Sequence, residues 1–200
     1  TGNDFILIDN RENSFPKENL DLVKRMCHRK WGIGADGLML IQSGDRNDFE
    51  MVFFNPDGSK SLCGNGSRCA IAFALSLGII SDQTTFTTTD GEHKAFLKDG
   101  VIQFQIHDIN EVDQKSEIDF YIHNGSPHHI RFVEDVRKID IVPEGEAIRH
   151  HDTYAPEGTN VNFVSIKEGT LHVRTFERGV EAETLSCGTG VVASAIASSI

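Results

Sequence analysis

The sequence predicts an α+β fold of two pseudo-symmetric halves, each a curled, mostly antiparallel sheet around a central buried helix. Two observations predict this repeat. First, Cys63-Gly-Asn-Gly66 and Cys187-Gly-Thr-Gly190 are matching motifs, and each opens a run of small apolar residues that is typical of a buried helix. Second, the spacing agrees, because 45 residues separate a predicted helix start at Glu18 from Cys63, and 43 separate Glu144 from Cys187.

The two motifs divide the chain into two predicted domains. We expect an N-terminal half over residues 1–110, with the first motif, and a C-terminal half over residues 111–200, with the second. The boundary is placed in the polar segment 108–117. Because Ile200 falls inside the helix that Cys187 opens, without a stop signal, we expect the second half to be truncated at its C-terminus.

Turn residues and apolar patterns predict the elements of the first half. After a strand at 4–9, a helix begins near Pro16 and ends near Trp31. Gly32-Ile-Gly-Ala-Asp-Gly37 matches a dinucleotide-binding fingerprint, but it follows a helix and precedes a strand, so it indicates a tight turn and not a nucleotide site. Further strands are expected at 38–41, 47–54, 84–88, 94–97 and 101–106, and the helix after Cys63 at 68–77.

The second half repeats this order. It is expected to contain strands at 120–123 and 130–133, a helix from near Pro143, strands at 160–166 and 171–176, and a helix at 191–200. The helix after Cys63 is apolar on all sides over residues 70–75. A helix without a polar face must be covered, so we expect strands to surround it.

Composition narrows the classes of function. Thirty acidic residues against 19 basic ones give a net charge of −11, and the basic residues are scattered, which argues against a nucleic-acid partner. The apolar runs are shorter than the roughly 20 residues of a membrane span. Four cysteines are too few for a disulfide scaffold, and no secretory segment is visible. We therefore expect a soluble protein of the cytoplasm with no nucleic-acid or membrane partner.

The cysteines of the two motifs point to acid/base chemistry. At a helix N-terminus, unpaired N–H groups and the helix dipole stabilise a thiolate, and they can also hold a substrate carboxylate. If the halves pack about a pseudo-twofold axis, Cys63 and Cys187 would lie on opposite faces of one carbon. One sulfur could then remove a proton while the other returns one to the opposite face, which is racemisation or epimerisation without a cofactor.

Other interpretations of the cysteines stay open. A zinc site could use Cys63, Cys69 and Cys187, but the separation of six residues between the first two fits no usual knuckle spacing, and we expect no metal. A reversible Cys63–Cys187 disulfide would make the protein a redox or ligand-binding module instead of an enzyme. Cys27 and Cys69 are expected in the cores of their helices. The histidines without a motif are expected at the surface or in packing: His28, His93, His107, His150 and His151.

Eight segments, taken together, resemble the diaminopimelate epimerase family. They are Gly2-Asn-Asp-Phe5, Gly32-Ile-Gly-Ala-Asp36, Asn55-Pro-Asp-Gly58, Cys63-Gly-Asn-Gly66, Pro127-His128, Thr159-Asn-Val161, Glu177-Arg-Gly179 and Cys187-Gly-Thr-Gly190. The resemblance implies a cytoplasmic, homodimeric isomerase of lysine and peptidoglycan-precursor biosynthesis, which converts LL- to meso-diaminopimelate without pyridoxal phosphate or any other cofactor. A related two-thiol racemase acting on proline or hydroxyproline is the alternative among enzymes.

The resemblance also implies roles for individual residues. Cys63 and Cys187 become the catalytic acid/base pair, with His128 and Glu177 beside them to adjust their proton transfers. The implied substrate-binding residues are Asn3, Asn55, Gly64, Asn65, Asn160, Glu177, Arg178, Gly188 and Thr189. Arg178 is suited to bind a distal carboxylate bidentately, which favours diaminopimelate over proline.

Two positions and one loop depart from the family's pattern. Some relatives have a glutamine at Gly37 and an asparagine at Ser126, so these substrate contacts are expected to be absent or made by water. The loop 180–184 is one residue longer than in some members, and we expect it to reshape the rim near Cys187.

Overall fold

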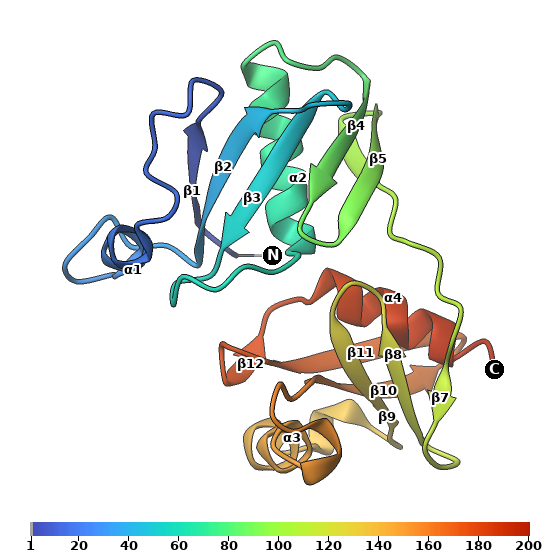
Figure 1. Cartoon of the computed structure of the whole chain (residues 1–200). Coiled ribbons are helices and arrows are strands. Elements are labelled where there is room, and N and C mark those ends of the chain that lie inside the picture. The colour runs from blue at the N-terminus through green and yellow to red at the C-terminus, as the bar shows by residue number, and fades with distance from the viewer. Residues whose placement is uncertain (1) are drawn as a thin grey trace. The chain divides into compact units, whose positions relative to one another are not determined.

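The computed structural model describes residues 2–200, which form two compact units (Figure 1). The N-terminal unit comprises residues 2–106 and the C-terminal unit residues 107–200. Each unit contains one six-stranded sheet and two α-helices. Within residues 2–200 no helix is both long enough and apolar enough to cross a bilayer.

The sheet of the N-terminal unit has its strands in sequence order, β1-β2-β3-β4-β5-β6. These strands are β1 (Phe5–Asp9), β2 (Gly37–Ser43), β3 (Phe49–Phe54), β4 (Gln83–Thr88), β5 (Gly91–Lys98) and β6 (Val101–Phe104). β1 is parallel to β2, and β3 to β4, while the other neighbours are antiparallel. The helices are α1 (Leu20–Cys27), between the first parallel pair, and α2 (Gly64–Ser76), between the second.

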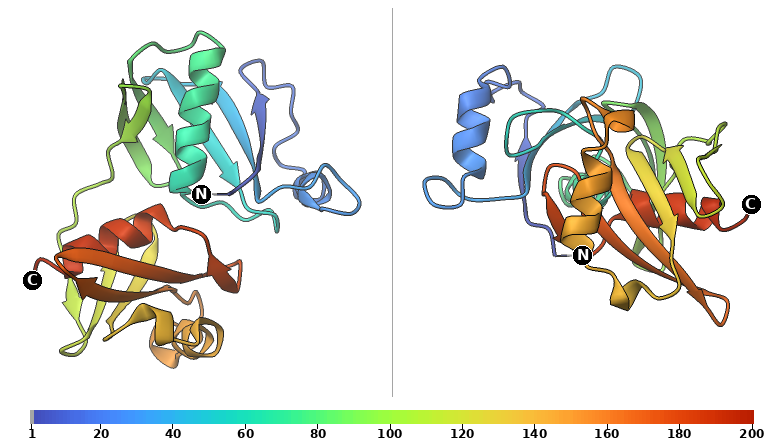
Figure 2. Two further views of the ribbon diagram at one scale, coloured as in Figure 1. Left: turned by 180° about the vertical axis from the view of Figure 1, so that it is seen from behind. Right: turned by 90° about the horizontal axis from the view of Figure 1, so that it is seen from below.

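Helices cover both faces of this sheet (Figure 2). In β2, Leu38 and Leu40 pack with α1, whereas Met39 and Ile41 pack with α2, because successive side chains of a strand point to opposite faces. α2 contacts both β1 and β6, the two edge strands of the sheet. The sheet therefore curls around α2, which confirms the predicted architecture of this half.

The C-terminal unit has the strand order β12-β11-β10-β9-β8-β7. Its strands are β7 (Asp113–Gln114), β8 (Asp119–His123), β9 (Pro127–Phe132), β10 (Asn160–Lys167), β11 (Thr170–Glu177) and β12 (Ala182–Thr184). Only β9 and β10 are parallel. The α-helices are α3 (Ile141–Arg149) and α4 (Gly188–Ala197), and two short 3₁₀ helices are η1 (Val136–Lys138) and η2 (Asp152–Tyr154).

The same two-sided packing occurs here. Val161 and Phe163 of β10 pack toward α3, whereas Val164 packs with α4. By the alternation of the strand, Asn162 also points to the α4 side. The order β1-α1-β2-β3-α2 of the first unit thus matches β9-α3-β10-β11-β12-α4 of the second, apart from the short added strand β12, with a parallel pair and then an antiparallel strand in each. The predicted α+β repeat is confirmed.

Several element boundaries differ from the expectations. α1 ends at Cys27, not near Trp31, because the Nδ1 atom of His28 accepts hydrogen bonds from the N–H groups of Lys30 and Trp31 and holds them in a turn. α2 and α4 begin directly after their cysteines, so the glycines of both motifs are helical. β7 and β12 were not expected, because two or three mostly polar residues are too few to show the alternation of apolar and polar side chains that indicates a strand.

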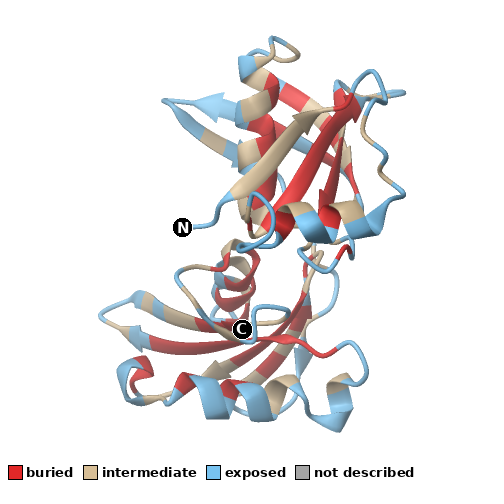
Figure 3. Cartoon of the chain, turned by 90° about the vertical axis from the view of Figure 1, so that its left-hand side faces the viewer, coloured by how far each residue is buried: buried red, intermediate tan, exposed pale blue. Residues whose placement is uncertain are grey.

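The expectation that strands surround the helix after Cys63 was wrong for one side of it. Arg68, Ala72 and Ser76 form an exposed stripe along α2, and Val191 and Ala195 form a similar stripe on α4. Figure 3 shows buried residues along the central strands of each sheet and a mixture of burial classes on the helices. A curled sheet covers only part of the circumference of a helix. The uncovered positions of α2 and α4 are mostly small residues, which expose little apolar area.

Candidate active site

Cys63 is the N-cap residue of α2. Its sulfur accepts a hydrogen bond from the N–H of Gly66 at 3.3 Å, and the side chain is partly buried. A Cβ atom on Gly66 would lie 3.2 Å from both the Cβ of Cys63 and the Sδ of Met39. A side chain here would be tightly packed against the cysteine, and glycine leaves the sulfur room beside the first helical turn.

Asparagines predicted to bind substrate surround this helix end. Asn65 donates through Nδ2 to Oδ1 of Asn3 at 2.8 Å, and Asn3 donates to Oδ2 of Asp36 at 3.0 Å. The Arg29 guanidinium donates to the carboxylates of both Asp36 and Asp4. This exposed ionic group orients two asparagines toward one another; Asp36 lay inside a matched motif, but nothing in the sequence indicated Arg29.

Asn55 is held separately. Its Nδ2 group donates to the hydroxyl oxygens of Ser59 at 3.0 Å and of Ser61 at 3.1 Å, within the turn that precedes Cys63. Gly37 lies at the start of β2, where a Cβ atom would come within 2.5 Å of the Phe53 ring. A glutamine therefore does not fit at position 37 unless that ring moves, which gives a packing reason for the departure from the family's pattern.

Cys187 is the N-cap residue of α4 and is only 8% exposed. Burial and the nearby charge of Glu177, the last residue of β11, raise the pKa of this thiol. Hydrogen bonds from the Thr189 hydroxyl and from the N–H groups of Thr189 and Gly190 lower it in part. Burial of the anion therefore opposes the thiolate expected at this helix N-terminus.

His128 reaches Cys187 through Thr189. Its Nε2 atom lies 2.9 Å from Oγ1 of Thr189, and that oxygen lies 3.5 Å from the sulfur of Cys187. His128 is fully buried, and burial lowers the pKa of its imidazole to about 3. The ring is thus neutral at physiological pH, and it acts on the cysteine as a hydrogen-bonding group and not as a cation.

Asn160 organises the strand ends near Arg178. Its Nδ2 donates to Oγ of Ser126 at 3.0 Å and to the carbonyl of Pro127 at 2.9 Å, while its Oδ1 accepts from the Arg178 N–H at 2.9 Å. Arg178 is half-buried, and burial lowers the pKa of its guanidinium. Ser126 thus has a protein partner in Asn160, so the serine helps to hold the residue predicted to contact the substrate.

The segment 180–184, expected to be a loop, is irregular only at its first two residues. Glu181 has a φ of 57° and pairs with Arg149 and His150, and the next three residues form β12. Asn124 was missed by the sequence analysis; its Nδ2 donates to the backbone carbonyl of Thr189 at 2.8 Å. No motif signalled this residue, because its role depends on a contact 65 positions away.

The first helical residues can bind an anion. Gly64 and Asn65 open α2, and Gly188 and Thr189 open α4, so their N–H groups have no partner within the helix. In each unit a cysteine therefore stands at the N-cap of a helix end that favours a carboxylate, and at Cys63 the sulfur itself accepts a cap hydrogen bond. The predicted roles of these residues toward a substrate stay predictions.

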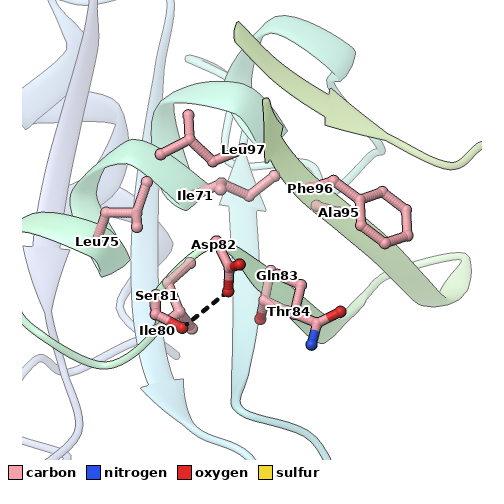
Figure 4. Close-up of a pocket in the computed structure, with 10 residues that line it drawn as sticks. All are labelled: Ile71, Leu75, Ile80, Ser81, Asp82, Gln83, Thr84, Ala95, Phe96 and Leu97. Atoms are coloured by element: carbon pink, nitrogen blue, oxygen red, sulfur yellow. Dashed lines mark hydrogen bonds between the residues drawn. The ribbon is translucent and has the colours of Figure 1, made fainter. Parts of the chain in front are cut away.

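Of the other two cysteines, Cys27 lies in a core as expected, whereas Cys69 is only partly buried. Cys27 is 2% exposed and packs from α1 against β2 and β3, and Cys69 packs against the cluster between α2 and the sheet. Burial raises the pKa of both thiols. One pocket of the N-terminal unit lies between α2 and the β4–β5 hairpin (Figure 4). Its lining consists of Ile71, Leu75, Ile80, Ser81, Asp82, Gln83, Thr84, Ala95, Phe96 and Leu97, which includes neither a cysteine nor a histidine.

Comparison with known proteins agrees with these features. The diaminopimelate epimerase of Flavobacterium psychrophilum is 48% identical over 98% of this chain and 78% of its own length. That of Aquifex aeolicus is 44% identical, with 99% of this chain and 78% of its own length covered.

Solved structures show the same fold at low identity. A PhzF-family phenazine biosynthesis protein of Bacillus anthracis has a TM-score of 0.67 at 15% identity, covering 94% of this chain and 71% of that one. A hydroxyproline epimerase of Agrobacterium vitis has a TM-score of 0.64 at 19% identity, covering 93% and 67%. The family model for diaminopimelate epimerase matches residues 1–111 and 120–200. On this match and on the identity to its curated members, the chain belongs to the diaminopimelate epimerase family.

Proposed function

We propose that this protein is a cofactor-independent epimerase that converts LL-diaminopimelate to meso-diaminopimelate. The observation that carries the proposal is the pair of cysteines, each capping a buried helix, in a chain of the diaminopimelate epimerase family. One sulfur, as thiolate, takes the α-proton, and the other, as thiol, delivers a proton to the opposite face of the same carbon. The stereocentre is inverted, and each turnover exchanges the protonation states of the two thiols.

The helix ends supply the electrostatic part of this proposal. N–H groups of Gly64 and Asn65 or of Gly188 and Thr189 bind the α-carboxylate and stabilise the charge that develops as the proton leaves. Arg178 binds the distal carboxylate, which a proline substrate lacks. The chemistry requires one sulfur on each face of the α-carbon.

Deuterium incorporation tests the proposal. We expect proton NMR in deuterium oxide, under reducing conditions, to show α-deuterium in the meso product and little in recovered LL substrate at early times. Such asymmetry identifies two bases, because a single base would return label to the substrate face as well. No exchange with diaminopimelate, together with exchange of proline or hydroxyproline, would replace the proposal by the related racemase.

The non-enzymatic alternative has a separate measurement. A redox module would form a Cys63–Cys187 disulfide reversibly and show no turnover, which a non-reducing gel and the same NMR experiment distinguish.

We also propose that the enzyme works in the cytoplasm as a homodimer, in lysine and peptidoglycan-precursor synthesis. The support is the resemblance to the family. Light scattering of the purified chain tests the oligomeric state.

A further inference from the structure

The amide of Asn162 has only one possible orientation. This residue is fully buried on β10, with its side chain on the α4 side. One amide atom lies 3.1 Å from the carbonyl oxygen of His129, which can only accept, so that atom is the NH2 nitrogen. The other atom, the oxygen, accepts from the Thr175 hydroxyl at 2.9 Å.

This orientation determines the tautomer of His128. The second hydrogen of the Asn162 amide points at Nδ1 of His128, 3.1 Å away, so Nδ1 is an acceptor without a proton. The proton of the neutral ring is then on Nε2, which donates to Oγ1 of Thr189 at 2.9 Å. With its oxygen accepting that bond, the Thr189 hydroxyl directs its own hydrogen to the sulfur of Cys187.

We infer that Asn162 and Thr175 are positioning residues that give this buried chain of hydrogen bonds its direction, so that Thr189 donates to the sulfur of Cys187. The inference deepens the proposed function and rests on it for its catalytic meaning. A hydroxyl that donates to sulfur stabilises the thiolate that the reaction needs, whereas the opposite direction would present a lone pair to that anion.

The surroundings favour one stable direction. Asn162, His128 and Thr175 are each at most 3% exposed, so solvent does not replace a lost bond. The start of α4 rests directly on the amide, since a Cβ atom on Gly190 would lie 2.2 Å from Oδ1 of Asn162. Other titratable groups act on the two ends of this series of hydrogen bonds: Glu177 on Cys187, and His123 and Arg178 on His128.

The tautomer can be measured directly. Nitrogen-15 NMR of histidine-labelled protein at neutral pH should show His128 with its proton on Nε2 and a bare Nδ1. A proton on Nδ1, in either a neutral ring or an imidazolium, would overturn the inference. This measurement needs no turnover, so it is independent of whether the chain epimerises diaminopimelate.

The last hydrogen bond of the series, between Thr189 and Cys187, is tested by the ionisation of Cys187. In a Cys63→Ser background, the pH dependence of iodoacetamide labelling, followed by peptide mass spectrometry, yields the thiol pKa of Cys187. Thr189→Val should raise that pKa by about one unit, so that labelling at pH 7.5 becomes about tenfold slower. Thr189→Ser, which keeps the hydroxyl, should leave the pKa at the value of the unchanged protein. A change in the accessibility of the Cys187 sulfur alone would change the labelling rate by the same factor at every pH and leave the pH midpoint unchanged.

Thr175, at the far end of this series of hydrogen bonds, is tested with a matched pair of variants. Thr175→Val should move the midpoint in the same direction, with labelling about threefold slower at neutral pH, and Thr175→Ser should not move it. The control is Thr184→Val on the strand paired with Thr175, because the buried Thr184 hydroxyl has no hydrogen-bond partner within residues 2–200. Equal shifts for Thr175→Val and Thr184→Val would overturn the inference.

A double-mutant cycle separates positioning from damage. Asn162→Leu alone should raise the pKa of Cys187, but in the Thr189→Val background it should add nothing, because its effect passes through Thr189. Additive shifts would show that Asn162 acts by another route and would overturn the inference. Inactivity toward diaminopimelate combined with the expected tautomer and cycle would instead contradict only the proposed function.

Discussion

The two cysteines occupy the same position in matching motifs, yet their surroundings differ in kind. Cys63 is partly buried, and the nearby asparagines are held by an exposed group of Arg29, Asp4 and Asp36. Cys187 is buried over a neutral chain of hydrogen bonds that contains His128. A duplicated motif thus reproduces the helix end, while the neighbours on the sheet differ, and at Cys187 burial raises the pKa of the thiol.

The largest expected effect tests whether both helix ends are needed. Cys63→Ala and Cys187→Ala should each lower kcat for epimerisation by at least about 10³-fold, because each removes an acid/base group that nothing else replaces. Cys27→Ala and Cys69→Ala are the controls, with turnover expected to persist. Comparable loss in all four variants would contradict the proposed pair of catalytic thiols.

The motif glycines should differ in their tolerance of alanine. Gly190→Ala places a Cβ atom 2.2 Å from the amide oxygen of Asn162, whereas Gly66→Ala places one 3.2 Å from its nearest neighbours. We expect Gly190→Ala to lower the free energy of unfolding by about 2–3 kcal/mol and Gly66→Ala by less than about 1 kcal/mol. Urea denaturation, followed by a probe in each unit, measures both. Equal costs would show that the two helix starts are packed alike.

The ionisation of Cys187 should reflect its burial. Because burial and Glu177 raise the pKa of this thiol, labelling by iodoacetamide should reach half its maximal rate above the ordinary thiol value of 9.0. Glu177→Gln removes one of the two causes and should lower the midpoint. A midpoint below 9.0 in the unchanged protein would mean that the helix end outweighs burial.

The buried histidines should give the two units opposite pH dependence. Burial lowers the pKa of His93, but its bonds to Asp90 and to the Gln105 carbonyl outweigh this, so the pKa is raised overall. Its contribution to stability is full below the unfolded value of 6.5 and is lost as pH rises through the folded pKa. For His128, whose pKa is lowered to about 3, stability is present above 6.5 and is lost as pH falls.

Amide hydrogen exchange measured between pH 5 and 8 reports the pH dependence of stability for each unit separately. Core amides of the N-terminal unit should become less protected as pH rises, after correction for intrinsic exchange, and those of the C-terminal unit more protected. His93→Gln should remove the first trend, and His172→Gln, an exposed histidine on β11, should change neither. Parallel trends in the two units would contradict the assignment of charge to His93 and neutrality to His128.

The sequence by itself determined the repeat, the family and the two cysteines. Glycines next to a cysteine, followed by small apolar residues, predict a helix end wherever they occur, since this depends on local backbone chemistry. The same locality explains why Cys27 was correctly placed in the core of its helix.

Only the tertiary structure decided what each site residue does. Asn162, Asn124 and Arg29 carry no motif, because their partners lie 7 to 65 residues away along the chain. The raised pKa of Cys187 likewise depends on how deeply α4 sits against β9, β10 and β11. Desolvation is a property of packed neighbours, so the motif alone could not reveal that burial opposes the helix end at this cysteine.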